Sequence, residues 1–429
     1  MQTQVAAGSA LARKVFGTAL FARVINAPTW LRNNTGPAPK QSQAEAKLKG
    51  QTTPDMPVVR VTDLSKTAGD TISVDCFDSI NGKPLMGDVD AEGRGDKLSS
   101  SSMDISINLS TKVVDAGGKM SQQRTLHNLR GIAMSQLAGY FPRLQTQTAI
   151  VHLAGARGSM VGRDWVVPPA SDSDFASIMV NTVKAPTYNR HLVIDGTGFV
   201  QGGQQLASIE ADDIWTLGHI DALSLMLKDM DIPLQHIRVM DDPAADDAPI
   251  LGVLYLTPRQ WNQVKTQAET SNRDWRSFLQ NAWNRKSYGS KHPLFSGEAG
   301  MWNGILVREA PRFTVRFEKS ETTKIITAAN RYTATETDAT VNAALAATSA
   351  VERAMLLGAQ ALGLVYGRNQ SSEYHFSWHE RRYNFKRNLE VAGDCMGGMS
   401  KIRFTYDDGQ GNKEPTDNGV FVIDSAVTK

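Results

Sequence analysis

The stretch Lys291–Arg312, KHPLFSGEAGMWNGILVREAPR, has the pattern of a loop, a tight turn and then a strand. Glycines and prolines interrupt it, and the short apolar run Ile305–Val307 lies between the last glycine and the last proline. It contains no nucleophile with a neighbouring base, so it indicates architecture and not catalysis. We expect Trp302 and Ile305 to pack in a core, and the Gly304 backbone to need a positive φ. The glycines expected to form this structural turn are Gly297, Gly300 and Gly304.

The overall composition favours a soluble protein with more than one core. At 429 residues the chain exceeds a single hydrophobic core, so two or three domains are expected. A net charge of +2 argues against a dedicated DNA-gripping protein, which needs a strong basic surplus. Cys76 and Cys395 are the two cysteines, which excludes a disulfide scaffold and a cysteine-based zinc site and fits a reducing cytoplasm. No apolar run approaches the roughly 20 residues that a membrane span needs, so no membrane contact is expected.

The N-terminal segment is basic and free of acids. Residues 1–44 contain no Asp or Glu. Leu11, Val15 and Ala19 lie at helical spacing, which is also typical of a transit peptide. We favour an extended arm with one short helix, whose cations Arg13 and Arg23 contact a neighbouring subunit or nucleic acid.

Two half-buried strands are predicted within Thr71–Leu109. Apolar residues alternate with polar ones in both halves of this segment. About 25 polar, glycine-bearing residues separate the halves, which is far longer than an ordinary hairpin turn. Because an isolated two-stranded ribbon is barely stable in water, its apolar face is expected to lie on another surface, most naturally a second copy of the chain. The residues expected at that contact are Ile72, Val74, Met103, Ile105 and Ile107.

Acidic residues in the long connection imitate the opening of a calcium-binding loop. Asp88, Asp90 and Glu92 take the first, third and fifth positions, but the twelfth is Ser99 where a bidentate glutamate is needed. We expect a solvated turn, and the pattern leaves open whether these acids bind an ion.

Helical patterns recur further along the chain. Ser121–Leu153 predicts a long helix that Pro142 kinks or divides. Thr257 is expected to cap a helix that has Pro258 in its first position and Gln260 completing a capping box. The alanine-rich segment Thr337–Tyr366 is also predicted to be a helix. Two strands, Lys401–Tyr406 and Gly419–Ile423, close the chain as a possible hairpin.

No enzyme motif stands out. Gly196, Gly198 and Gly202 follow a short apolar run and imitate a dinucleotide fingerprint, but no repeating strand–helix units follow them. His375 and His379 are four residues apart, yet Phe376 stands where a metalloprotease helix needs a glutamate. The sequence therefore predicts no catalytic, cofactor-binding or metal-binding residues.

Several short segments stand in a recognisable order along the chain: Met120–Arg124, Tyr255–Trp261, Pro293–Gly297, Gly300–Gly304 with Val307–Glu309, and Arg353–Ala361. In this order they resemble the major capsid proteins of N4-like tailed bacteriophages. They cover the chain from about residue 55 to its end, whereas residues 1–50 and about 160–185 match nothing. Around Trp378–Asn384 the family is usually acidic, but Arg381 and Arg382 stand here.

This resemblance implies the α+β fold that tailed-phage major capsid proteins share. Its expected parts are an N-terminal arm (1–54), an extended β-hairpin loop (55–118) and a peripheral domain with a long spine helix (119–189). Residues 190–370 are expected to form mainly the axial domain, with some peripheral segments, and 371–429 to return as strands to the peripheral domain.

The implied function is that of a structural, non-enzymatic protein of the virion. It would assemble with copies of itself into hexamers and pentamers of an icosahedral head that encloses double-stranded DNA, which it contacts non-specifically. Scaffolding, portal and decoration proteins are further expected partners, and assembly would occur in the host cytoplasm. Two alternatives are a cellular nanocompartment shell of the same fold and a dinucleotide-binding enzyme built on Gly196–Gly202.

Overall fold

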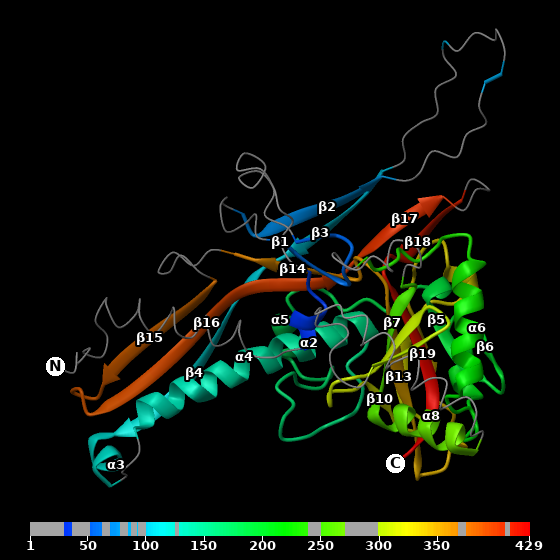
Figure 1. The fold of residues 1–429 in the computed structure, drawn as a ribbon. Coiled ribbons are helices and arrows are strands. Elements are labelled where there is room, and N and C mark those ends of the chain that lie inside the picture. The colour runs from blue at the N-terminus through cyan, green and yellow to red at the C-terminus, as the bar shows by residue number, and fades with distance from the viewer. Residues whose placement is uncertain are drawn as a thin grey trace.

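The computed structural model describes residues 30–36, 52–61, 69–77, 85–86, 92, 100–124, 128–238, 250–270, 299–367, 375–407 and 412–429. Figure 1 shows a broad body built on a large sheet, with a long helix and long strands running away from it side by side. Helices and strands are mixed without regular alternation, so the predicted α+β class is confirmed.

The body is built on an eight-stranded sheet with the order β6-β5-β19-β13-β7-β9-β8, in which β10 also pairs with β13. Helices α6 (Leu217–Lys228) and α8 (Pro258–Thr270) pack on one face of it. Its central strands are buried on both faces and mostly apolar, as expected of strands inside a sheet that is covered on both sides. The strands are β5 (His191–Asp195), β6 (Gly198–Gln201), β7 (Gly252–Leu256), β8 (Ala299–Trp302), β9 (Ile305–Glu309), β10 (Arg316–Phe317), β13 (Ser349–Leu357) and β19 (Val420–Thr428).

The predicted helix over Thr337–Tyr366 is wrong, because this segment forms β12 (Thr337–Thr340), β13 and β14 (Leu362–Tyr366). Every residue of β13 is buried. The strand pairs with β19 along one edge and with β7 and β10 along the other. A strand that is buried on both faces shows no polar–apolar alternation to separate it from a buried helix, so here sheet pairing overrides helix propensity.

The long helix is confirmed, with a break near its start. α3 (Lys119–Arg124) precedes α4 (Leu129–Ala154), whose 26 residues span about 39 Å. Asn128 caps the N-terminus by accepting a hydrogen bond from the Gly131 amide, and Gly155 ends the helix with a φ of 67°. Pro142 lies inside α4 and does not end it.

A five-stranded sheet lies along α4 (Figure 1). Its order is β1-β14-β16-β15, and β4 pairs with the same part of β16 as β15 does, on the opposite edge. The strands are β1 (Val58–Val61), β4 (Asn108–Gly118), β14, β15 (Phe376–Tyr383) and β16 (Asn388–Lys401).

The C-terminal strands divide between the two sheets. β15 and β16 join the five-stranded sheet, whereas β19 lies between β5 and β13 in the eight-stranded sheet. The expected terminal hairpin also has another partner, because β17 (Arg403–Asp407) pairs with β18 (Lys413–Asp417).

Part of the expected N-terminal arm belongs to the core. α2 (Trp30–Asn33) buries Leu31, and the fully buried Asn34 accepts a hydrogen bond of 2.8 Å from the Tyr255 hydroxyl of β7. The following strand, β1, pairs in parallel with β14. Residues 30–36 and 52–61 are thus built into the folded body.

Short elements complete the described chain. β11 and β12 form a two-stranded sheet, and no described helix is both long and apolar enough to cross a membrane. The remaining elements are α5 (Phe175–Met179), β11 (Thr322–Ile325) and the 3-10 helices η3 (Tyr188–Arg190), η4 (Gln204–Ala207) and η6 (Ala328–Asn330).

The turn within the stretch Lys291–Arg312 is a two-residue hairpin loop between β8 and β9. Asn303 and Gly304 have φ angles of 45° and 84°, the pattern of the tight turn that the Asn-Gly pair favours. Ile305 is fully buried and Trp302 packs against the same core. Gly300 lies within β8 and not in the turn, and Gly297 lies outside the described residues.

Candidate assembly site

Strands β2 (Thr71–Phe77) and β3 (Ser100–Ser106) form an antiparallel ribbon, as the alternation predicts. Ile72 lies opposite Ile105, and Val74 lies opposite Met103. Four apolar side chains therefore share one face, while Ser73, Asp75 and Asp104 line the other.

The apolar face of the ribbon packs on the ribbon's own chain. Met103 and Ile105 are 7% and 0% exposed and form a cluster with side chains of β1, β14 and β17. Gly363 of β14 leaves room for Ile105, since a Cβ there would lie 2.5 Å from the Ile105 Cδ1. Met103 and Ile105 thus need no second copy to be buried, which corrects the reasoning that assigned them to an interface. Ile72, Val74 and Ile107 are half-buried, and their contact with a second copy stays a prediction.

Distant strands supply the surface beneath the ribbon, which is why the sequence pattern alone did not locate it. Val365 and Phe404 in this cluster are about 260 to 300 residues away from Ile105 in the chain. Cys76 and Tyr406 also meet there, with 3.9 Å between the thiol sulfur and the hydroxyl oxygen.

The connection between β2 and β3 carries exposed apolar side chains. Leu85 and Met86 are 45% and 76% exposed. Asp88 and Asp90 of the calcium-like pattern lie outside the described residues, as do Arg13 and Arg23, and Glu92 is exposed. Within the described residues no group of three or more acids, histidines or cysteines is placed to hold a metal ion.

The β15–β16 hairpin ends in an exposed, basic tip. Asn384, Phe385 and Lys386 have φ angles of 51°, 51° and 63°, and the Phe385 side chain is 95% exposed. Below the tip, Glu380 is buried and receives two hydrogen bonds from the Arg130 guanidinium of α4, of 2.6 and 3.0 Å. Arg381 and Arg382 therefore form an exposed basic surface beside one internally paired acid.

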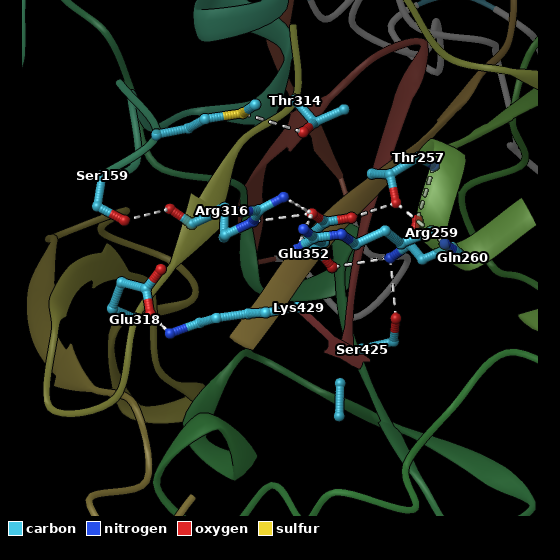
Figure 2. A network of polar contacts seen from close by, with 12 residues as sticks. Ser159, Thr257, Arg259, Gln260, Thr314, Arg316, Glu318, Glu352, Ser425 and Lys429 are labelled. Atoms are coloured by element: carbon cyan, nitrogen blue, oxygen red, sulfur yellow. Dashed lines mark hydrogen bonds and ion pairs between the residues drawn. The ribbon is translucent and has the colours of Figure 1, made fainter. Parts of the chain in front are cut away.

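A buried carboxylate organises the body (Figure 2). Glu352 of β13 is 1% exposed and accepts hydrogen bonds of 2.9 and 2.5 Å from the Nε and Nη2 of Arg316. The Thr257 hydroxyl donates to its other carboxylate oxygen. Thr257 and Gln260 form the predicted capping box, and the Gln260 amide reaches the Glu352 carbonyl at 2.8 Å. Helix α8, β10 and β13 are thus fixed to one another through Glu352.

A second buried network joins the body to the long helix. Asp424 of β19 receives hydrogen bonds of 2.7 and 2.9 Å from Arg353, and Arg353 Nη1 donates to the Ala154 carbonyl at the end of α4. His191 lies 2.8 Å from Asp424, whose pKa is lowered to about 2 by the Arg353 charge and these hydrogen bonds, against the opposing effect of burial. Burial lowers the pKa of His191.

The glycines that imitate a dinucleotide fingerprint form another structure. Gly196 and Gly198 turn β5 into the antiparallel strand β6, and the 3-10 helix η4 follows. A dinucleotide site needs a strand, a glycine-rich turn and a helix N-terminus, so this alternative is contradicted by the topology.

Comparison with known proteins agrees with this architecture. A family described as phage capsid protein matches residues 4–429. The chain belongs to this family. No curated protein matches it.

Solved structures of phage capsids resemble this capsid protein over most of its length. The capsid of Ralstonia phage GP4 is 22% identical, with a TM-score of 0.67, and the match covers 91% of this chain and 93% of that one. The cyanophage Pam1 capsid is 20% identical, with a TM-score of 0.57 and coverages of 88% and 90%. For the capsid of Helicobacter pylori bacteriophage KHP30 the values are 13%, 0.56, 94% and 93%. At these identities the likeness shows the shared fold, which is the tailed-phage capsid fold that the sequence predicted.

The protein is a structural component of the phage capsid. The features that sequence reasoning missed are the exposed Phe385 and the buried carboxylates Glu352 and Asp424. The cation-rich segment Arg381–Lys386 is the local signal in the sequence for the hairpin tip. The buried ion pairs join residues of different strands and have no local signal.

Proposed function

We propose that this capsid protein assembles head-to-tail into hexamers and pentamers, which close into an icosahedral shell around double-stranded DNA. The observation that carries this proposal is the family match over residues 4–429. Each contact in such a ring joins two different surfaces of the same chain, and many moderate contacts together stabilise the shell. The work proposed for the protein is structural and not enzymatic.

Two exposed features support specific roles in the contacts between copies. The ribbon buries one apolar face on its own chain and presents Leu85 and Met86 in its long connection. Phe385 lies in the turn between β15 and β16, and its side chain is exposed. Exposed large apolar side chains of this kind favour burial against another protein surface, and a second copy is the partner that a capsid family supplies.

We assign the predicted domains to the two sheets as part of this proposal. The eight-stranded sheet with α6 and α8 would be the axial domain, and the five-stranded sheet with α4 the peripheral domain. The ordered motifs quoted above favour the N4-like group of tailed phages within the family. The cationic Arg13 and Arg23 would lie in an arm that contacts neighbours or DNA.

The proposed function also implies further partners and a compartment for assembly. Scaffolding, portal and decoration proteins are expected to meet the shell, and assembly is expected in the host cytoplasm before the protein resides in the virion. A net charge of +2 fits non-specific contact with DNA, because a strongly basic inner wall would hold the genome too tightly to release it.

Purified particles from infected cells test this function. The expected result is a shell of uniform diameter whose nuclease-protected content is double-stranded DNA. Small shells filled with protein would indicate the nanocompartment alternative, and tight binding of DNA by the free chain at physiological salt would contradict the weakly binding wall.

A further inference from the structure

A strained turn lies between the long helix and the ribbon. Helix α5 ends at Met179, and Val180 then takes φ 64° and ψ −60°. The Asn181 amide donates to the Met179 carbonyl at 2.7 Å, which closes a three-residue turn around Val180. A positive φ is an outlier for a β-branched residue, so the surrounding contacts must hold the turn in place.

The Asn181 side chain bonds both backbone groups of Ser106, as a neighbouring strand would. Its Oδ1 accepts a hydrogen bond of 2.9 Å from the Ser106 amide, and its Nδ2 donates to the Ser106 carbonyl at 3.0 Å. The Nδ2 also donates to the Met399 carbonyl of β16 at 3.1 Å. A carboxamide carries a donor and an acceptor side by side, so it satisfies both backbone groups of one residue as a neighbouring strand does.

Ser106 lies where the ribbon joins the five-stranded sheet. It is the last residue of β3, and β4 begins at Asn108 in the five-stranded sheet. The β16 backbone approaches it so closely that a Cβ on Gly398 would lie 2.0 Å from the Ser106 carbonyl oxygen. The Ile107 amide donates to the Asp70 carbonyl at the start of the other ribbon strand, at 2.8 Å. Asn181 therefore bonds the ribbon where it leaves the body.

The long helix holds the other side of this turn. Met179 is 1% exposed and belongs to a small core with Val151 and Val167. Its carbonyl oxygen lies 3.2 Å from Nε2 of His152, in the last turn of α4. A continuous series of hydrogen bonds thus links His152 of α4 to Met179, Met179 to Asn181, and Asn181 to Ser106.

We propose that Asn181 is a positioning residue that fixes the direction of the ribbon relative to α4 and the five-stranded sheet. The reach of the ribbon onto a second copy rests on the proposed function, but the fixing itself is a property of the single chain. The strain at Val180 supports this role, because a disfavoured backbone conformation persists where contacts on both sides require it.

Hydrogen exchange of the unassembled, full-length chain tests the proposal. Asn181→Ala removes all three side-chain hydrogen bonds, and Asn181→Asp keeps the size but loses both donated ones. In both variants we expect the ribbon strands and the Ile107 amide to exchange at least about tenfold faster, because each variant loses two or more hydrogen bonds and one alone changes the rate by up to about that factor. The Ser106 amide should exchange faster in Asn181→Ala, which removes its acceptor, than in Asn181→Asp, which keeps an acceptor oxygen. Exchange in β13 and β19 should stay unchanged.

Two further variants make the result specific. Asn342→Ala removes another asparagine side chain, which donates to the Ile209 carbonyl at 2.9 Å far along the chain from the ribbon, and should leave ribbon exchange as in the wild type. Val180→Gly relieves the positive φ while keeping Asn181, and should also leave it unchanged. Wild-type exchange of the ribbon strands in either Asn181 variant would overturn the proposal. Failure of the wild-type chain to form shells would instead contradict the proposed function and leave this result standing.

Discussion

Replacing Gly304 with valine is expected to lower the free energy of unfolding by about 3 kcal/mol. A residue with a Cβ loses roughly 1–2 kcal/mol in the left-handed region, and the φ of Gly304 is 84°. The added Cβ would also lie 3.2 Å from Leu251 Cδ1, and the branched side chain adds further crowding. Since Trp302 and Ile305 flank the turn and pack in the core of the body, the strain cannot be relieved by moving the loop alone.

Urea denaturation followed by tryptophan fluorescence measures this effect, with Gly304→Asn and Gly304→Ala as graded variants. Asparagine tolerates the left-handed region best, so the expected order of destabilisation is Val, then Ala, then Asn. Gly139→Val is the matched control: Gly139 is exposed in α4, has no positive φ, and a Cβ there would meet nothing within 4 Å. Equal stabilities for Gly304→Val and the wild type would refute the placement of the turn.

Three other substitutions test the buried carboxylate Glu352, the buried His152 and the exposed Phe385. Glu352→Gln should lower the free energy of unfolding by about 2–3 kcal/mol in the same urea assay, because it leaves the largely buried Arg316 charge without its carboxylate. Glu318→Gln, where the carboxylate is 39% exposed, is the control and should change the free energy of unfolding by less than about 0.5 kcal/mol. Similar losses in both variants would contradict the role of Glu352. Burial lowers the pKa of His152 to about 4 in the folded chain, whereas the ordinary value is about 6.5. As the pH drops from 6.5 toward 4, the unfolded chain therefore binds a proton that the folded chain does not, and the free energy of unfolding should fall. His152→Gln should reduce the loss between pH 7 and 4.5 by roughly 2–3 kcal/mol, and an unchanged pH profile would contradict this. Phe385→Ser should leave the urea midpoint unchanged, because the side chain is 95% exposed, yet reduce the yield of shells in sedimentation, and full assembly would remove Phe385 from the proposed contacts.

Local signals in the sequence predicted the parts of the fold that local interactions specify. Thr257 and Gln260 form their capping box within one helical turn, and the alternation around Ile72 and Ile105 places both residues on one face of the ribbon. The Asn303–Gly304 pair carries its turn in its own backbone preferences. These interactions span few residues, so their patterns are visible without the rest of the chain.

Long-range pairing explains what sequence reasoning missed. Ser349–Leu357 is buried throughout because sheet neighbours cover both of its edges and other elements cover both faces, so its sequence shows no alternation that distinguishes a strand from a helix. The surface beneath the ribbon is built by β1, β14 and β17. The expectation of a second copy assumed an isolated ribbon, whereas the ribbon packs on its own chain. Asn181 gave no signal at all, since its partners Ser106 and Met399 lie 75 and 218 residues away.

Imaging of the purified chain by electron microscopy at side-chain resolution tests the assembly proposal most directly. The expected result is closed shells of hexamers and pentamers in which the β2–β3 connection of each subunit, with Leu85 and Met86, lies against a neighbouring copy. Uniformly monomeric protein without rings or shells, under conditions in which the chain is folded, would contradict it.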